Sequence, residues 1–204
     1  MNDADLLQLE MDTLWGPDDV GRDGDTPLVA IGVAPDGRVV PSRAGTTRTA
    51  ELLGSIASVT AAGGPSYVIE NAVTPAGSAI VTSDETVPTA LHAARPAKWW
   101  EREEWSDLLA GRLGPWAIAV DTGRVVALCH TPRARGRAAE AGVWTHPDDR
   151  RRGHASAVTS AWAAIARSRY DVLFYSTSAD NLASQGVARR LGLRPIGWIW
   201  QLRG

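Results

Sequence analysis

The chain has 204 residues, enough for one large domain or two small ones, with 44% hydrophobic and 22% charged residues as in ordinary globular proteins. Its formal net charge of -2 lacks the basic excess that a nucleic-acid partner requires, so we expect no such partner. The single cysteine, Cys129, excludes an intramolecular disulfide and a multi-cysteine metal site. The first residues do not resemble a secretory signal, and no run of about 18 apolar residues occurs. We therefore expect a cytoplasmic protein without a membrane span.

The N-terminal half alternates apolar runs with turn residues, and its expected elements are short. They are a helix at the start of the chain, two strands in residues 27–41 around an Asp36-Gly37 turn, a helix over Thr46–Ala61 that AAGGP ends, and strands in SYVIENAV and SAIVTS. These elements are amphipathic, so we expect ordered structure here rather than disorder.

The C-terminal half gives a clearer succession of elements. We expect two helical segments that meet at Pro96, a hairpin over residues 116–132 with its turn at 121–123, a strand ending at His146-Pro147, a helix after Gly153, a strand over Val172–Thr177, a helix from about Asn181 and a final apolar strand. The order strand, helix, strand, helix, strand predicts an α/β fold with a mixed sheet flanked by helices.

A basic turn precedes the helix that follows Gly153. The N–H groups at a helix start have no partner within the helix and lie at the positive end of its dipole, so they can hold a phosphate oxygen. Gly153 allows close approach of the backbone, and Arg150, Arg151 and Arg152 add positive charge. On its own, such a turn is also explained as a solvated run of charge.

Two segments resemble the motifs of GCN5-related N-acetyltransferases, the GNAT superfamily. VWTHPDDRRRGHA follows that family's passage from strand to helix, with Arg150, Gly153 and Ala155 at its Gln or Arg, Gly, and Gly or Ala positions. Asn181-Leu-Ala-Ser184, continuing to ARRLGL, resembles the second motif, in which an Asn opens a helix near coenzyme A. The resemblance covers about residues 98–204. We therefore expect a GNAT domain over residues 96–204, and an accessory region or diverged GNAT-like half over 1–95.

The resemblance implies acetyl-CoA as the co-substrate and a site for it without a metal ion. The implied contacts to the cofactor are Val143, Trp144 and Thr145 along the pantetheine arm, Arg150, Arg151, Arg152, Gly153, His154 and Ala155 around the pyrophosphate, and Asn181 and Ser184 in the second motif. His146 and His154 are eight residues apart, which fits no compact metal motif, so we expect them at the surface.

Glu140 lies where this family often carries a base that acts through water. A carboxylate that is salt-bridged to Arg137 or Arg124 is the alternative. His130 is the second candidate base, because histidine titrates near neutral pH and lies on the preceding strand. It could equally be a hydrogen-bonded cap on a Thr131-Pro132 turn.

The acid that protonates the leaving thiolate is the point at which the chain departs from the family. Many members have a tyrosine seven residues after the motif Asn, and this chain has Ala188 there. Tyr175, Ser176 and Ser178 lie on or after the neighbouring strand and are the possible replacements, although a strand tyrosine is often a core residue.

The sequence therefore predicts an N-acetyltransferase that acts on a primary amine of a small molecule or peptide by direct transfer in a ternary complex. A non-catalytic acyl-CoA binding or sensing module is the alternative, and a monomer or a homodimer fits either. Tryptophans 99, 100, 105 and 116 cluster where the family builds its acceptor site, which suggests an apolar or aromatic acceptor. Trp198 and Trp200 share one strand face, and core packing is favoured over an acceptor wall.

Overall fold

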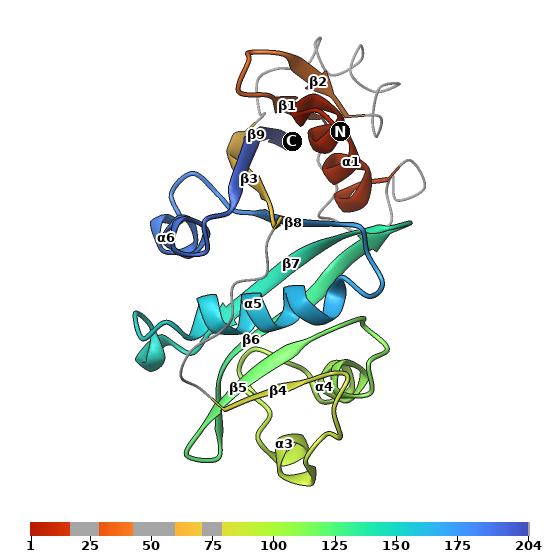
Figure 1. The fold of residues 1–204 in the computed structure, drawn as a ribbon. Coiled ribbons are helices and arrows are strands. Elements are labelled where there is room, and N and C mark those ends of the chain that lie inside the picture. Colours follow the sequence, from red (N-terminus) through yellow and green to blue (C-terminus); the bar gives the residue numbers. More distant parts are fainter. Residues whose placement is uncertain (17–28, 43–59, 71–78, 204) are drawn as a thin grey trace.

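The computed structural model describes residues 1–16, 29–42, 60–70 and 79–203 (Figure 1). Nine strands form a single sheet in the order β2-β1-β9-β3-β8-β7-β6-β5-β4. They are β1 (Val29–Val33), β2 (Val39–Pro41), β3 (Thr60–Val68), β4 (Ala79–Thr82), β5 (Ala117–Asp121), β6 (Arg124–Arg135), β7 (Ala138–Thr145), β8 (Val172–Ser176) and β9 (Arg194–Arg203). Among the described strands only β7 and β8 are parallel, so the sheet is mixed, as predicted.

Helices cover both faces of this sheet. They are α1 (Asp3–Leu14), α3 (Thr89–Ala93), α4 (Arg102–Leu109), the 3-10 helix η2 (Pro147–Asp149), α5 (His154–Ala166) and α6 (Leu182–Arg190). Alternate residues of a strand point to opposite faces. Ala139 packs with α5 and α6 in one hydrophobic cluster, whereas Ala138 packs with α1 in another. Leu128 lies opposite Trp144 and packs with α3 and α4, which places these helices on the face of α1.

Helix α1 shows how the sequence fixes the face that it buries. The Asn2 side chain accepts a hydrogen bond from the Asp5 N–H, and Asp5 accepts one from the Asn2 N–H, which together form a capping box. Leu7 and Met11, one turn apart, are fully buried against the sheet. Glu10 lies on this buried side as well.

The N-terminal segment contributes to the centre of the sheet. Strand β3 lies between β8 and β9 and is antiparallel to both, so residues 60–68 are hydrogen-bonded to the last two strands of the chain. The predicted division between residues 95 and 96 falls between α3 and α4, which pack in the same cluster as β5 and β6. That the two parts form separate domains stays a prediction.

One expected helix end is in fact part of a strand. The AAGGP segment, residues 61–65, was expected to stop a helix, but it lies inside β3. A side chain on Gly64 would place its Cβ 1.9 Å from the Thr177 carbonyl oxygen, and one on Gly63 would approach the Trp200 ring to 2.7 Å. These glycines therefore allow close packing of strands rather than a turn. The rest of the expected helix lies outside the described residues.

Strand β6 is also longer than expected. The predicted Thr131-Pro132 turn is wrong, because β6 runs on to Arg135 and its pairing with β7 shifts between His130 and Arg133. Proline has no N–H to donate to a ladder, and a bulge accommodates it. His130 is therefore a strand residue, and the cap on a turn that was the alternative for it does not exist.

The buried and exposed tryptophans are not the ones that the sequence predicts. Trp198 and Trp200 stack on each other with ring centroids 5.7 Å apart and are 38% and 43% exposed, so core packing was the wrong choice for them. In contrast, Trp100, Trp105 and Trp116 are buried in the cluster under α3 and α4. Of the four predicted acceptor tryptophans only Trp99 is exposed, which removes most of the argument for an aromatic acceptor.

The position of β3 can be tested with one glycine pair. Gly64→Ala should lower the free energy of unfolding by roughly 1–3 kcal/mol or more, because the added Cβ meets backbone that has no space to move. Gly186→Ala in α6, whose nearest neighbour is the far end of Arg189 at 3.8 Å, is the control and should be neutral or stabilising. Urea denaturation measures both, and equal stabilities would contradict the placement of β3 beside β8.

Candidate active site

Strands β7 and β8 are paired only at their beginnings. The parallel register joins Ala138–Glu140 to Val172–Phe174 and then stops, although β7 continues to Thr145 and β8 to Ser176. The β8-facing edge of Val143, Trp144 and Thr145 has no strand partner in the described part of the chain. An opening between two strands leaves N–H and C=O groups available to a ligand.

Glu140 lies where the two strands separate. Its Oε1 accepts hydrogen bonds from the Ser176 N–H at 2.7 Å and the Ser176 hydroxyl at 2.8 Å. The Glu140 side chain thus accepts from the Ser176 N–H, which has no main-chain acceptor on β7 because the strand pairing has ended. The predicted salt bridge is not formed, because Arg137 pairs with Asp171 and Arg124 pairs with Asp149.

The turn before α5 has the geometry of an anion site. Gly153 is the N-cap residue with φ of 89°, and no side chain caps the helix. The first helical hydrogen bond runs from the Ala157 N–H to the Gly153 carbonyl, so the N–H groups of the preceding turn have no acceptor within the helix. A Cβ on Gly153 would meet only the Arg190 Nη1, at 3.8 Å. The space in front of Gly153, at the start of α5, is therefore open.

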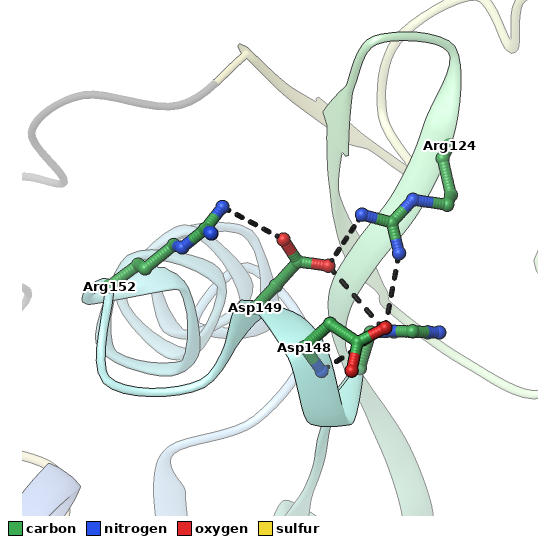
Figure 2. Close-up of polar contacts among 5 residues, drawn as sticks. Arg124, Asp148, Asp149 and Arg152 are labelled. Atoms are coloured by element: carbon green, nitrogen blue, oxygen red, sulfur yellow. Dashed lines mark hydrogen bonds and ion pairs between the residues drawn. The ribbon is translucent and has the colours of Figure 1, made fainter.

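A buried acid holds this turn in place. Asp149 is only 1% exposed, and Figure 2 shows Arg124 and Arg152 approaching it from opposite sides, at 2.8 Å and 3.1 Å. Arg152 is thus engaged within the turn. Arg150 and Arg151 are exposed, and no acid in the described ranges pairs with either of them. Asp149 fixes the backbone of the turn to β6, and the remaining arginines face solvent.

Arg190 is a residue of this site that sequence reasoning missed. It lies in the last turn of α6 and its guanidinium is close to Gly153. Asp149 was also missed, since an acid inside a basic run reads as one more surface charge. The ARRLGL segment contained the signal for Arg190, because it places two arginines at the end of a helix that packs beside α5.

Asn181 and Ser184 lie at the start of α6. The Asn181 side chain caps the helix by accepting from the Ser184 N–H at 3.1 Å. The Ser184 hydroxyl is 2.5 Å from the Tyr175 hydroxyl. Tyr175 is 2% exposed, and burial raises its pKa to about 12. Ser178 donates a hydrogen bond to Asp180 at the surface, so it is Ser176 rather than Ser178 that reaches Glu140.

Glu140 and His130 have opposite electrostatic environments. Burial raises the pKa of Glu140 to about 7, although its hydrogen bonds from Ser176 act in the other direction. Burial lowers the pKa of His130 to about 4, and its ring lies 5.1 Å from that of Trp100. His130 lies opposite Gly142 and therefore on the same sheet face as Glu140. A base is most effective when its pKa is near the working pH, which favours Glu140.

A second carboxyl, which the sequence analysis did not single out, lies on the same face. Glu10 of α1 is fully buried and accepts a hydrogen bond from the Ser66 hydroxyl of β3. Burial raises the pKa of Glu10 well above its usual value, and the charge of Glu140 raises it further. The signal was present in the sequence, because Glu10 occupies a core position of α1 between Leu7 and Leu14.

A cleft of about 910 Å³ opens on the face of α1 and α4. It is lined by Leu14, Trp15, Glu104, Gly111, Arg112, Leu113, Gly114, His130, Thr131, Pro132, Arg133, Ala134, Arg169 and Tyr170. On β6 the cleft is lined by His130, which lies opposite Gly142, and by Arg133, which lies opposite Glu140. The cleft and the basic turn thus lie toward opposite ends of β7.

The comparisons with known proteins identify the family. The family model described as the acetyltransferase (GNAT) domain matches residues 74–194, more than half of the chain. The chain belongs to the GNAT family of acetyltransferases. The match begins before residue 98 and so includes β4, α3 and α4 in the GNAT domain. No curated protein matches the chain.

Solved GNAT structures share the fold of this chain. An acetyltransferase of the GNAT family from Colwellia psychrerythraea is 14% identical with a TM-score of 0.55, over 98% of this chain and 71% of the other. A tandem GNAT protein from the clavulanic acid pathway is 15% identical with a TM-score of 0.54, over 85% and 63%. A GNAT-family protein from Novosphingobium aromaticivorans is 22% identical with a TM-score of 0.51, over 71% and 66%. The chain thus spans about two thirds of the length of these proteins, and the likeness concerns the fold.

Two further findings limit what the described residues contain. None of their helices is long and apolar enough to cross a membrane. In the ranges that the structure describes, no group of three or more His, Cys, Asp or Glu side chains is arranged to hold a metal ion.

The usual GNAT tyrosine has no space in this chain. Ala188, which stands at its position, is fully buried in the same cluster as Tyr175 and Trp162. A tyrosine at residue 188 would have to displace packed side chains. The replacement of the family tyrosine by Ala188 is therefore accompanied by close packing of the core around that position.

Gly153 provides the first test of the turn. Gly153→Asp should raise the Michaelis constant for acetyl-CoA at least tenfold, because a carboxylate would repel the pyrophosphate. Gly153→Asn is the matched control, since Asn has a similar size and tolerates the same positive φ without adding charge. Initial rates and calorimetry with coenzyme A measure both variants. Equal affinity of the Asp and Asn variants would argue against an anion at this turn.

Glu140 should also impose a pH dependence on stability. Between its usual pKa of 4.5 and about 7 the folded protein binds more protons than the unfolded chain. The contribution of Glu140 to the free energy of unfolding should therefore fall as pH rises through this window, by up to about 3 kcal/mol. Glu140→Gln keeps an acceptor for Ser176 and should reduce the slope by this contribution in urea denaturation at several pH values, leaving the contribution of Glu10. A variant with an unchanged slope would contradict the raised pKa.

Proposed function

We propose that this GNAT protein is an N-acetyltransferase that transfers the acetyl group of acetyl-CoA to a primary amine of a small molecule or peptide. Transfer is direct, within a ternary complex. The observation that carries the proposal is the opening between β7 and β8, with the basic turn toward one end of β7 and the cleft toward the other. Cofactor and acceptor can then meet near Glu140.

The cofactor is assigned to the opening and the basic turn. The pyrophosphate binds the N–H groups at the start of α5, where Gly153 has no side chain to block its approach. Positive charge comes from Arg150, Arg151 and Arg190. The pantetheine arm pairs with the β7 edge at Val143–Thr145, which supplies main-chain donors and acceptors. Support for this assignment comes from the uncapped helix start and the unpaired edge.

Glu140 is assigned the role of base. It takes a proton from the attacking amine, through a water molecule, while the new N–C bond forms and the C–S bond breaks. The amine must be neutral to attack, and a base with a pKa of about 7 is half-deprotonated at neutral pH. A backbone N–H of β7 aimed at the thioester oxygen would add about 3 kcal/mol of transition-state stabilisation.

The coenzyme A thiolate leaves without a strong acid from the protein. Tyr175 and Ser178 are the candidates, but a tyrosine with a pKa of about 12 holds its proton more tightly than a thiol with a pKa of about 8.5 does. Proton transfer from Tyr175 to the thiolate is thus uphill. We therefore assign protonation of the thiolate to solvent. Tyr175 instead supports α6 through its contact with the Ser184 hydroxyl.

A non-catalytic acyl-CoA module is the second candidate function, and Ala188 is the observation that favours it. The two differ in turnover, because only an enzyme releases free thiol from acetyl-CoA in the presence of amines. An amine panel with mass spectrometry of the products decides between them. A cytoplasmic location and a monomeric or homodimeric state belong to the proposal in either case.

The pH profile tests the base. For the wild type, kcat/KM should rise with pH to about 7 and then level, following the deprotonation of Glu140. Glu140→Gln should lower the plateau by about 10²–10⁴-fold and remove this limb. Glu103→Gln, the same change on the exposed surface of α4, is the control. If Glu140→Gln retains the wild-type profile, the base is another group, with His130 the next to test.

A further inference from the structure

Glu10 is a buried acid that the proposed reaction does not yet use. It belongs to α1, outside the residues that match the family model. It is 0% exposed, and one of its oxygens accepts a hydrogen bond from the Ser66 hydroxyl. Its other oxygen, Oε1, is buried without a hydrogen-bond partner in the described structure. Burial of a carboxyl is costly unless it is paired or protonated, so this position calls for an explanation.

Two serines on neighbouring strands connect Glu10 to Glu140. Ser66 of β3 lies directly opposite Ser176 of β8 in the antiparallel register. Ser66 donates to Glu10, and Ser176 donates to Glu140. Like Glu10, Glu140 has one buried oxygen, Oε2, without a hydrogen-bond partner among the described residues. The serines therefore bring the two carboxyls to the same part of this sheet face, and each carboxyl has one oxygen without a partner among the described residues.

The charged and titratable groups around this pair give no compensation for two negative charges. On β6, Arg133 lies opposite Glu140 but is exposed, and His130 lies opposite Gly142. On β9, Arg194 pairs with Asp3 and Glu70. Cys129 and Tyr175 belong to the cluster on the opposite face of the sheet. No cation of the described residues forms an ion pair with Glu10 or Glu140. Two ionised carboxylates in this buried position would repel each other, so one proton remains on the pair.

We propose that Glu10 is a positioning residue for Glu140, and that its protonated carboxyl donates a hydrogen bond to the Glu140 carboxylate. The donor is the oxygen of Glu10 that Ser66 does not contact, and the acceptor is Oε2 of Glu140. During the reaction Glu140 takes the proton of the amine and returns it to solvent, while Glu10 keeps its own. The inference rests on the proposed function, since it concerns the base of that reaction.

The position of α1 supports this role. Leu14 lines the cleft and lies one helical turn after Glu10, on the same side of α1. One face of this helix therefore supplies both a wall of the cleft and the partner of Glu140. The raised pKa of Glu10, caused by burial and by the charge of Glu140, agrees with a carboxyl that stays protonated at neutral pH.

Two substitutions of Glu10 distinguish a hydrogen-bond donor from a packing residue. Gln is the isostere of a protonated Glu, because its carbonyl can accept from Ser66 while its N–H donates to Glu140. Leu fills a similar volume and donates nothing. Glu10→Gln should keep the acid limb of the pH profile of kcat/KM where the wild type has it. Glu10→Leu should move that limb up by about one pH unit, because the Glu140 carboxylate loses its only donor on that oxygen.

Infrared spectroscopy provides a readout that needs no turnover. At about pH 8 the wild type should show the band of a protonated carboxyl, and Glu10→Gln should lack it. Equal pH profiles for the Gln and Leu variants, or a wild type without the protonated band, would overturn the inference. If no amine is acetylated at all, the proposed function fails, and the infrared band still decides whether Glu10 carries the proton.

Discussion

The separation of β7 from β8 is the constraint on which the rest of this molecule depends. Two parallel strands that part inside a sheet expose main-chain groups, and each exposed group needs a partner. Glu140 supplies one of them, because its carboxyl accepts from the backbone and the hydroxyl of Ser176 where the pairing ends. The same carboxyl is buried by this bridging position, which raises its pKa to about 7. The side chain that bridges the two strands is thus also the base that we propose.

The N-terminal segment completes the surroundings of that side chain. Strand β3 pairs with β8 and β9, so Ser66 lies next to Ser176, and α1 brings Glu10 to the same face. These elements come from outside the residues that match the family model. The residues that precede the family match therefore adjoin the proposed base, Glu140.

Most of the C-terminal fold could be predicted because its signals are local. The turn at 121–123, the Gly153 that starts α5 and the Asn181 cap each depend on residues that are neighbours in the sequence. The errors arose where distant contacts decide. Gly63 and Gly64 looked like helix breakers but allow Thr177 and Trp200 to approach, and Trp198 lies in a strand whose face remains exposed.

In the candidate site, too, features set by neighbouring residues could be predicted, whereas those set by distant contacts could not. The basic turn was readable from its sequence, whereas the role of Asp149 depends on Arg124 of another strand. The proposed partner of Glu140 could not be predicted from the sequence, because Glu10 and Glu140 are far apart in the chain and the order of β3, β8 and β7 brings their serine partners together. A charged residue at a core position of a helix, as in α1, is the sequence pattern that indicates a buried polar partner.

The most direct measurement is a crystal structure of the protein with coenzyme A. We expect the diphosphate on the main-chain N–H groups at the start of α5 beside Gly153, and the thiol between β7 and β8 near Glu140. A coenzyme A bound elsewhere, or an opening between these strands that stays filled by the protein's own side chains, would contradict this expectation.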